Sequence, residues 1–351
     1  MTSLKHTVRA IPALDASAMS QARARQCRLT KPPGSLGVLE DISIRLAGIF
    51  GTPRPRIGGK SVIVCAGDHG VVAQGVSAYP QEVTGQMVAN ILSGGAAINV
   101  LARHVGARVV VLDVGVIAEH PPHPNLVNRK VGRGTADLSI GPAMTRRQAV
   151  ASIEAGIEAA GREIACGATL IATGDMGIGN TTASSAIAAV LCGCPPAAVT
   201  GSGTGLKVEQ QTHKTQVIER AVSVNRPDPE DAIDVLSKIG GFEIGAICGV
   251  ILKAAAERVP VVVDGFISTA GALIAHALVP RSCDYMIATH ISVEAGHRVM
   301  LDRLGLTAFF DVDFRLGEGT GAALAMSFVE AACKILDEMA TFESAGVADG
   351  R

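Results

Sequence analysis

Short β-branched runs alternate with longer alanine-rich runs along most of this chain. The short runs are typical of strands and lie at 61–67, 107–116, 168–175, 259–265 and 284–290, and the apolar run 61–67 is typical of a buried strand. The longer runs have helical spacing and lie at 82–106, 145–165 and 181–193. This alternation predicts an α/β fold with a doubly wound, mainly parallel, Rossmann-like sheet.

Both ends of the chain are predicted to be helical. Helices are expected at 13–29 and 35–50, before a Pro- and Gly-rich linker, and again at 321–340. The last of these carries an apolar stripe at helical spacing: Leu324, Phe328, Ala331, Ile335 and Met339. We therefore predict a small helical domain built from both termini beside a large Rossmann-like domain that holds the active site. The predicted boundaries are 1–60 together with 319–351 for the small domain and 61–318 for the large one.

Composition excludes several classes of partner. With 31 Lys and Arg against 32 Asp and Glu, and no Trp, the chain has neither the basic surface nor the stacking residues of a nucleic-acid binder.

The eight cysteines are scattered in mostly apolar runs, so we expect reduced, buried thiols. The first fifteen residues lack a continuous apolar run, and the apolar helix at 244–252 ends at Lys253. We expect a cytoplasmic protein with no membrane span.

Acids and glycine turns follow most of the predicted strands. They stand at 67–70 (GDHG), 113–115 (DVG), 174–182 (GDMGIGNTT), 264–266 (DGF), 289–294 (THISVE) and 317–319 (GEG). Because the carboxyl ends of parallel strands lie at one edge of a sheet, these residues are expected to meet in one crevice.

Glu318 is the residue that looks most like a catalyst. It lies in a glycine-rich turn between the strand-like run 307–314 and the helix at 321–340, where backbone can approach a ligand closely. Taken alone, it could equally be an acid that suits the N-terminus of a helix.

Two glycine-rich turns could hold an anion. The turn at 174–182 opens a helix with free amides and hydroxyls, although a simple Thr or Asn cap would look the same. The turn at 200–207 (TGSGTGLK) matches neither a Walker A motif nor a full GxGxxG fingerprint. Lys214 could reach a phosphate, or could be a solvated helix lysine.

Asp68 and His69 suggest a metal or acid–base role, but no further residues complete a metal set, and a structural role is favoured.

Seven motifs together resemble one family. They are KPPGSLGVLE (31–40), CAGDHGV (65–71), YPQEVTGQM (79–87), TGDMGIGNTT (173–182), DVLSKIGGFEIGAI (234–247), VDGFIS (263–268) and RLGEGTGAALAM (315–326). In this order they resemble the nicotinate-nucleotide–dimethylbenzimidazole phosphoribosyltransferases of cobalamin assembly. The resemblance runs from about residue 31 to 340, nearly the whole chain.

The resemblance implies a reaction and a set of residues. Nicotinate mononucleotide and a lower-ligand base would give the α-riboside 5′-phosphate and nicotinate, in a homodimer without metal or organic cofactor. The catalytic glutamate falls on Glu318, and the second active-site carboxylate, usually Glu, falls on Asp175, which is one methylene shorter. The substrate-binding positions implied are Tyr79, Gln86, Met87 and Met176 around the base, Gly177, Gly179, Ser202, Gly203 and Lys214 around the phosphate, Asp264 and Ser292 around the ribose and phosphate, and Leu316.

Two other functions compete with this one. An NAD(P)-dependent oxidoreductase needs a GxGxxG turn after the first strand with an acid about 20 residues further on, and CAGDHGVVAQG (65–75) supplies neither. A sensor that binds the mononucleotide without turning it over remains open.

Overall fold

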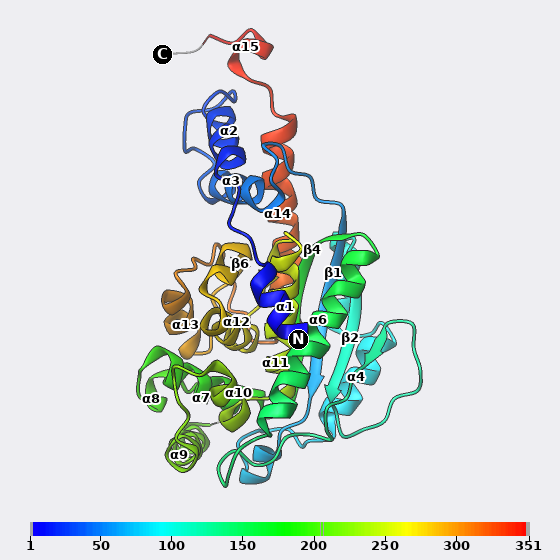
Figure 1. Cartoon of the computed structure of the whole chain (residues 1–351), viewed down its shortest axis with the longest axis vertical. Coiled ribbons are helices and arrows are strands. Elements are labelled where there is room, and N and C mark those ends of the chain that lie inside the picture. The colour runs from blue at the N-terminus through cyan, green and yellow to red at the C-terminus, as the bar shows by residue number, and fades with distance from the viewer. Residues whose placement is uncertain (1–2, 204, 206, 349–351) are drawn as a thin grey trace.

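A six-stranded parallel sheet forms the centre of the computed structural model, which describes residues 3–203, 205 and 207–348 (Figure 1). Its order is β3-β2-β1-β4-β5-β6, and every neighbouring pair is parallel. The strands are β1 (Gly59–Gly67), β2 (Arg108–Gly115), β3 (Leu126–Asn128), β4 (Ala168–Met176), β5 (Val261–Val263) and β6 (Met286–Ala288). The predicted fold class is confirmed. The strand order reverses between β1 and β4, which is where such sheets bind ligands.

Helices cover both faces of this sheet. On one face α6 (Arg146–Ala165) and α11 (Phe242–Ala256) pack against β1 and β4. On the other face lie α4 (Val83–Leu92), α5 (Ala97–Val105) and the first half of α14 (Thr320–Glu338). The remaining elements are η1 (Gly70–Gln74), α7 (Asn180–Cys192), α8 (Pro196–Val199), α9 (Val208–Asn225), α10 (Ala232–Ile239), α12 (Phe266–Leu278), η2 (Pro280–Tyr285), α13 (Gly296–Leu304) and α15 (Phe342–Ala345).

Two glycines let α6 and α11 cross with their backbones in contact. A Cβ on Gly156 would lie 1.9 Å from the carbonyl oxygen of Ala246, and a Cβ on Gly249 would lie 1.9 Å from that of Ile153. No side chain fits between these backbones, so the distance between the two helices is fixed by the absence of side chains at the crossing.

Gly156→Ala is expected to destabilise the protein, although alanine normally favours a helix. Moving the helices apart to admit one methyl should lower the free energy of unfolding by about 1–3 kcal/mol. Gly161→Ala on the same helix is the control, because its Cβ would meet only the flexible end of Lys253, at 3.1 Å from Cε. Thermal unfolding measures both, and a Gly156→Ala melting temperature at or above the Gly161→Ala value would contradict this account.

The helices near the chain ends pack together, at the top of Figure 1. These are α2 (Ala16–Gln26), α3 (Val38–Phe50) and the second half of α14, around a small core that includes Ala22, Ala47 and Leu336. By contrast, α1 (Ser3–Ala10) lies against α6 and α11. The two-domain division stays a prediction, and its positions 1–2 and 349–351 lie outside the described residues.

Four sequence predictions were wrong in detail. The cysteines are not all buried, since Cys27 and Cys166 are exposed. The run 307–314 is not a strand: its only ladder contact among the described residues is a single bridge between His290 and Phe310, because β6 already ends at Ala288. The predicted helix 82–106 is two helices, since Ser93 and Gly94 form a turn after α4.

The buried face of α14 is also not the predicted stripe. Small residues such as Ala322 and Ala325 lie against the sheet together with Met326 and Val329, whereas Phe328 is 45% exposed. Close packing on a sheet selects small side chains, which a search for large apolar residues overlooks.

One segment is apolar enough to be considered as a membrane span. Val83–Val105 has a mean hydropathy of 1.2 and 39% of its most apolar window is buried, but the fold divides the segment into α4 and α5. It is therefore weak evidence for a span.

Candidate active site

A cavity of about 570 Å³ lies at the carboxyl ends of the strands, beside the reversal between β1 and β4. Asp175 and Met176 enter its wall from the end of β4, and Gly317 enters from the turn before α14. Apolar residues make up most of the remaining wall, among them Tyr79, Ala97, Leu101, Ile178 and Leu316. Polar groups converge on this largely apolar space, as is typical of a small-molecule site.

Glu318 lies in a strained turn beside this cavity, and the neighbouring Gly317, not Glu318 itself, lines the cavity. Its φ is +62°, and the glycines on either side, Gly317 and Gly319, have φ of +81° and +88°. Three successive left-handed residues are rare, and the one with a side chain carries a cost of about 1–2 kcal/mol. Arg226, Arg258 and Asp313 also have a positive φ, but Glu318 is the one of these four residues that is buried. Strain of this kind is kept mainly at functional sites.

The Glu318 carboxylate is buried but not fully paired. The side chain is 3% exposed, the backbone amide of Ile98 at the start of α5 donates to it, and Oε2 has no hydrogen-bond partner among the described residues. Burial raises the pKa of Glu318, and the nearby charge of Asp264 adds to this, while the Ile98 amide works against it. The result is a carboxylate with an unpaired oxygen and increased proton affinity.

Asp175 lies next to the same turn. A Cβ on Gly317 would be 3.1 Å from each of its carboxylate oxygens, and Asn180 Nδ2 donates to Oδ2 at 2.9 Å. Burial raises the pKa of Asp175 well above its usual range, and the charges of Asp264 and Glu243 raise it further, against the Asn180 hydrogen bond. The two candidate catalytic carboxylates are therefore neighbours, as expected from their motifs.

Asp175→Asn is expected to stabilise the fold at alkaline pH. Since the folded state binds the Asp175 proton more tightly than the unfolded chain, stability falls as pH rises through the raised pKa. A neutral amide removes that loss, which we expect to increase the free energy of unfolding by about 1–3 kcal/mol at pH 8. Melting temperatures of the variant and of wild type from pH 4 to 8 check this prediction. The stability difference between them should shrink toward pH 4. A variant no more stable than wild type at pH 8 would refute the prediction.

Lys214, the predicted phosphate-binding lysine, lies behind the part of the cavity wall that Thr181 and Gly203 form. It is fully buried on α9, and its Nζ donates to Thr181 Oγ1 at 2.7 Å. A Cβ on Gly203 would lie 2.9 Å from this Nζ, so the glycine turn passes directly over the ammonium group. Burial lowers the pKa of Lys214 to about 8, and the Glu294 carboxylate partly counters the shift. A buried cation beside a glycine turn and a helix N-terminus suits a phosphate.

The other predicted site residues fall into two groups. Those that line the cavity are Tyr79, Met176, Gly177, Gly203, Ser292 and Leu316. Those that do not are Gln86, Met87, Gly179, Ser202 and Asp264; Gln86 is exposed, Met87 packs on the core, and Gly179 begins α7 with a φ of +92°. Positions 204 and 206 of the predicted second turn lie outside the described residues.

Several cavity residues were not singled out from the sequence. Asn180, Thr181, His290, Glu294 and Arg315 all line the cavity. The first four lie inside strand-end motifs that the sequence did identify, so proximity to those motifs was the available signal. Their individual roles needed the side-chain geometry.

A hydrogen-bond network orients His290. Thr289 Oγ1 donates to the Val263 carbonyl, so its oxygen accepts from His290 Nδ1 at 2.9 Å, and Nε2 is left to face the cavity. His297 Nδ1 accepts a hydrogen bond from the Ser292 amide, and its Nε2 is hydrogen-bonded to Thr269 Oγ1. Burial lowers the pKa of His297 to about 3. His297 is therefore neutral, and its hydrogen bonds hold the loop that carries His290 and Ser292 in place.

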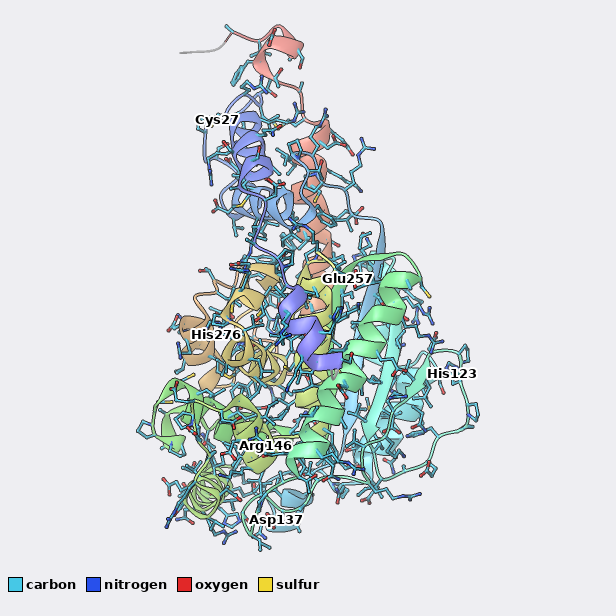
Figure 2. The ribbon with its side chains drawn as sticks, in the orientation of Figure 1. Cys27, His123, Asp137, Arg146, Glu257 and His276 are labelled. Atoms are coloured by element: carbon cyan, nitrogen blue, oxygen red, sulfur yellow. The ribbon has the colours of Figure 1, made fainter. Side chains whose placement is uncertain are left out.

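His69 has the structural role that its sequence favoured. It is fully buried, and its Nε2 lies 2.7 Å from Glu243 Oε1, at the start of α11. His123 lies in the long connection between β2 and β3, at the periphery of the molecule (Figure 2). Neither histidine belongs to a group of metal-ligating side chains within the described part of the chain.

Comparisons with known proteins agree on one family. A family model described as "Phosphoribosyltransferase" matches residues 11–347. The nicotinate-nucleotide–dimethylbenzimidazole phosphoribosyltransferase of Roseiflexus sp. (strain RS-1) is 59% identical, over 99% of this chain and 98% of its own length. The enzyme of the same name from Geobacter sulfurreducens is 55% identical, over 100% and 99%. The crystal structure of the enzyme from Thermus thermophilus is 50% identical, covers 96% of this chain and 100% of its own, and superposes with a TM-score of 0.92.

Proposed function

The chain belongs to the nicotinate-nucleotide–dimethylbenzimidazole phosphoribosyltransferase family, and on that basis we propose that it moves the 5-phosphoribosyl group of nicotinate mononucleotide to 5,6-dimethylbenzimidazole or a related lower-ligand base. The products are α-ribazole 5′-phosphate and nicotinate. The observation that carries the proposal is one cavity lined by Asp175, by Gly317 of the Glu318 turn, and by Thr181 and Gly203, which lie against the buried Lys214.

Glu318 is proposed as the general base. An unprotonated ring nitrogen of the acceptor attacks the anomeric carbon with its lone pair, and the ring becomes cationic. Its remaining N–H is then far more acidic, and the unpaired Oε2 of Glu318 can take that proton. Burial raises the pKa of Glu318 and so increases its proton affinity.

Asp175 is proposed to stabilise the transition state. As the bond from the anomeric carbon to nicotinate breaks, its electron pair returns to the pyridinium nitrogen and neutral pyridine leaves. The sugar then carries oxocarbenium-like positive charge, which the ionised form of Asp175 stabilises although burial raises the pKa of this residue. Asn180 fixes the orientation of Asp175 through its 2.9 Å hydrogen bond. In-line attack on the face opposite the leaving group converts a β-riboside into an α-riboside.

A nicotinate-release assay tests the function. The purified chain is incubated with nicotinate mononucleotide, with and without dimethylbenzimidazole, and free nicotinate is measured. We expect release only when the base is present. Release without base would indicate a hydrolase, and no release under either condition would support the sensor alternative. A panel of benzimidazoles, purines and phenols in the same assay then defines the preferred acceptor.

We further propose that the protein is a cytoplasmic homodimer. The outer side of α14 leaves Phe328 exposed, and its ring stacks with Phe310 and contacts Phe309. A second copy of the chain would cover this apolar surface by a two-fold contact. Sedimentation should give twice the 35.9 kDa chain mass, and Phe328→Glu should give the chain mass. A wild-type protein that sediments as a single chain would refute the dimer.

A further inference from the structure

Asp264 follows β5 at the same edge of the sheet, but it faces α14 and does not line the cavity. The side chain is 2% exposed, and both carboxylate oxygens accept backbone hydrogen bonds. Oδ2 accepts from the Gly319 amide at 3.1 Å, and Oδ1 accepts from the Ala322 amide at 2.9 Å. Its hydrogen-bonding capacity is therefore directed to the first turn of α14, immediately after Glu318.

The turn that receives these bonds is strained and tightly confined. It contains the three left-handed residues 317–319, and Glu318, the one with a side chain, needs support from its surroundings to keep this conformation. On its far side the Glu318 backbone rests on β4, where a Cβ on Gly174 would lie 2.5 Å from the Glu318 carbonyl oxygen. The turn therefore packs against Gly174 on one side, and Asp264 accepts its hydrogen bonds on the α14 side.

We propose that Asp264 is a positioning residue that holds the Glu318 turn in its reactive geometry, and that it is not a ligand of the ribose. The inference rests on the proposed role of Glu318 as the base. Loss of Asp264 would let the turn relax toward an unstrained backbone, and the Glu318 carboxylate would leave the Ile98 amide.

Asp264 also acts on Glu318 through its charge. The negative charge of Asp264 contributes to the raised pKa of Glu318. The other ionisable groups around this pair are Asp175 on β4, Glu243 on α11 and His290 after β6, and His290 lowers the pKa of Asp264. The two effects of Asp264 have separate consequences. The position in which it holds the Glu318 turn sets the turnover rate, and its negative charge shifts the pH at which Glu318 is protonated.

Asp264→Asn is the test. Asparagine keeps one acceptor oxygen but places an amide NH₂ against a backbone N–H, so one hydrogen bond and the charge are lost. Because small displacements of a reacting group can cost about 10²-fold, we expect kcat to fall by about that factor while the Kd for nicotinate mononucleotide changes less than about threefold. The acid limb of the kcat/KM profile should move to lower pH, since a negative neighbour of Glu318 has gone.

A double mutant separates positioning from a general loss of structure. If Asp264 acts through Glu318, adding Asp264→Asn to Glu318→Gln should lower kcat by less than about threefold further. The matched control is Asp113→Asn: Asp113 is also a buried strand-end aspartate, and it accepts from the amides of Gly115 and Val116. This control should lose some stability but keep wild-type kcat and an unmoved acid limb.

Three outcomes would overturn the inference. They are a wild-type kcat in Asp264→Asn, a loss confined to mononucleotide binding, and a full multiplication of the two single-mutant defects. If Asp264→Asn does not fold, Asp264→Glu replaces it: the longer side chain keeps the charge, so kcat should fall with the acid limb in place. Unchanged turnover there would count equally against positioning.

A measurement without turnover distinguishes this inference from the proposed function. The pKa of Glu318 is read by ¹³C NMR, with Glu318→Gln assigning the resonance. It should fall in Asp264→Asn even if the wild-type chain released no nicotinate. An unchanged Glu318 pKa would refute the coupling between the two residues, whereas absent nicotinate release would refute only the function.

Discussion

Glu318→Gln is expected to lower kcat by roughly 10²–10⁴-fold, the usual contribution of a positioned general base. The amide is isosteric and keeps an oxygen for the Ile98 amide, so the turn should stay folded, but it cannot accept the proton of the alkylated base. Single-turnover measurement of nicotinate release checks the chemical step directly. The Kd for nicotinate mononucleotide should remain within a few fold of wild type.

Glu163→Gln is the control for this variant. Glu163 is a buried glutamate on α6 that accepts from Ser61 Oγ at 2.8 Å, remote from the cavity lining. It should turn over at the wild-type rate. Near wild-type turnover in Glu318→Gln itself would remove Glu318 as the base.

Lys214→Met is expected to raise the KM for nicotinate mononucleotide by roughly 10–100-fold, because a charge-assisted hydrogen bond to the phosphate is worth about 1.5–3 kcal/mol. The binding form of Lys214 is the cation, and burial lowers the pKa of Lys214 to about 8. Wild-type affinity should therefore fall as pH rises through 8 in the free enzyme, by up to about tenfold per unit. Calorimetry between pH 6.5 and 9.5 measures this slope.

The methionine variant should show no such slope across that range. Lys31→Met tests for a general effect of losing a buried lysine, since Lys31 is paired with Glu40 at 2.6 Å in the small helical cluster. It should lose stability but keep the wild-type KM. Lys214→Met with unchanged affinity at pH 7 would place the phosphate elsewhere.

The sheet was predictable because its strands are buried on both faces. The run 61–67 contains one polar residue, Ser61, and this pattern has few alternatives. The run 307–314 looked similar but fails as a strand, because its phenylalanines pack on one another and on His290 beside a sheet that has already ended. The spacing of apolar residues indicates that their side chains are buried, but it does not indicate which elements they pack against.

The site was predictable at the level of motifs and not of contacts. Convergence of strand ends placed Asp175 and the Glu318 turn at one cavity, as parallel topology requires. The sequence could not show that Asp264 turns away from the cavity toward two amides of α14. Nor could it show that Lys214 is buried under a glycine turn, since a helical lysine is normally solvated.

The left-handed backbone of Glu318 has a consequence for protein engineering. A glycine at this position would adopt the same φ of +62° without steric cost, and would gain about 1 kcal/mol of stability. Directed evolution for heat resistance alone would therefore favour loss of the proposed base. A library built on this scaffold needs turnover as a second selection, because at this position the fold and the chemistry prefer different residues.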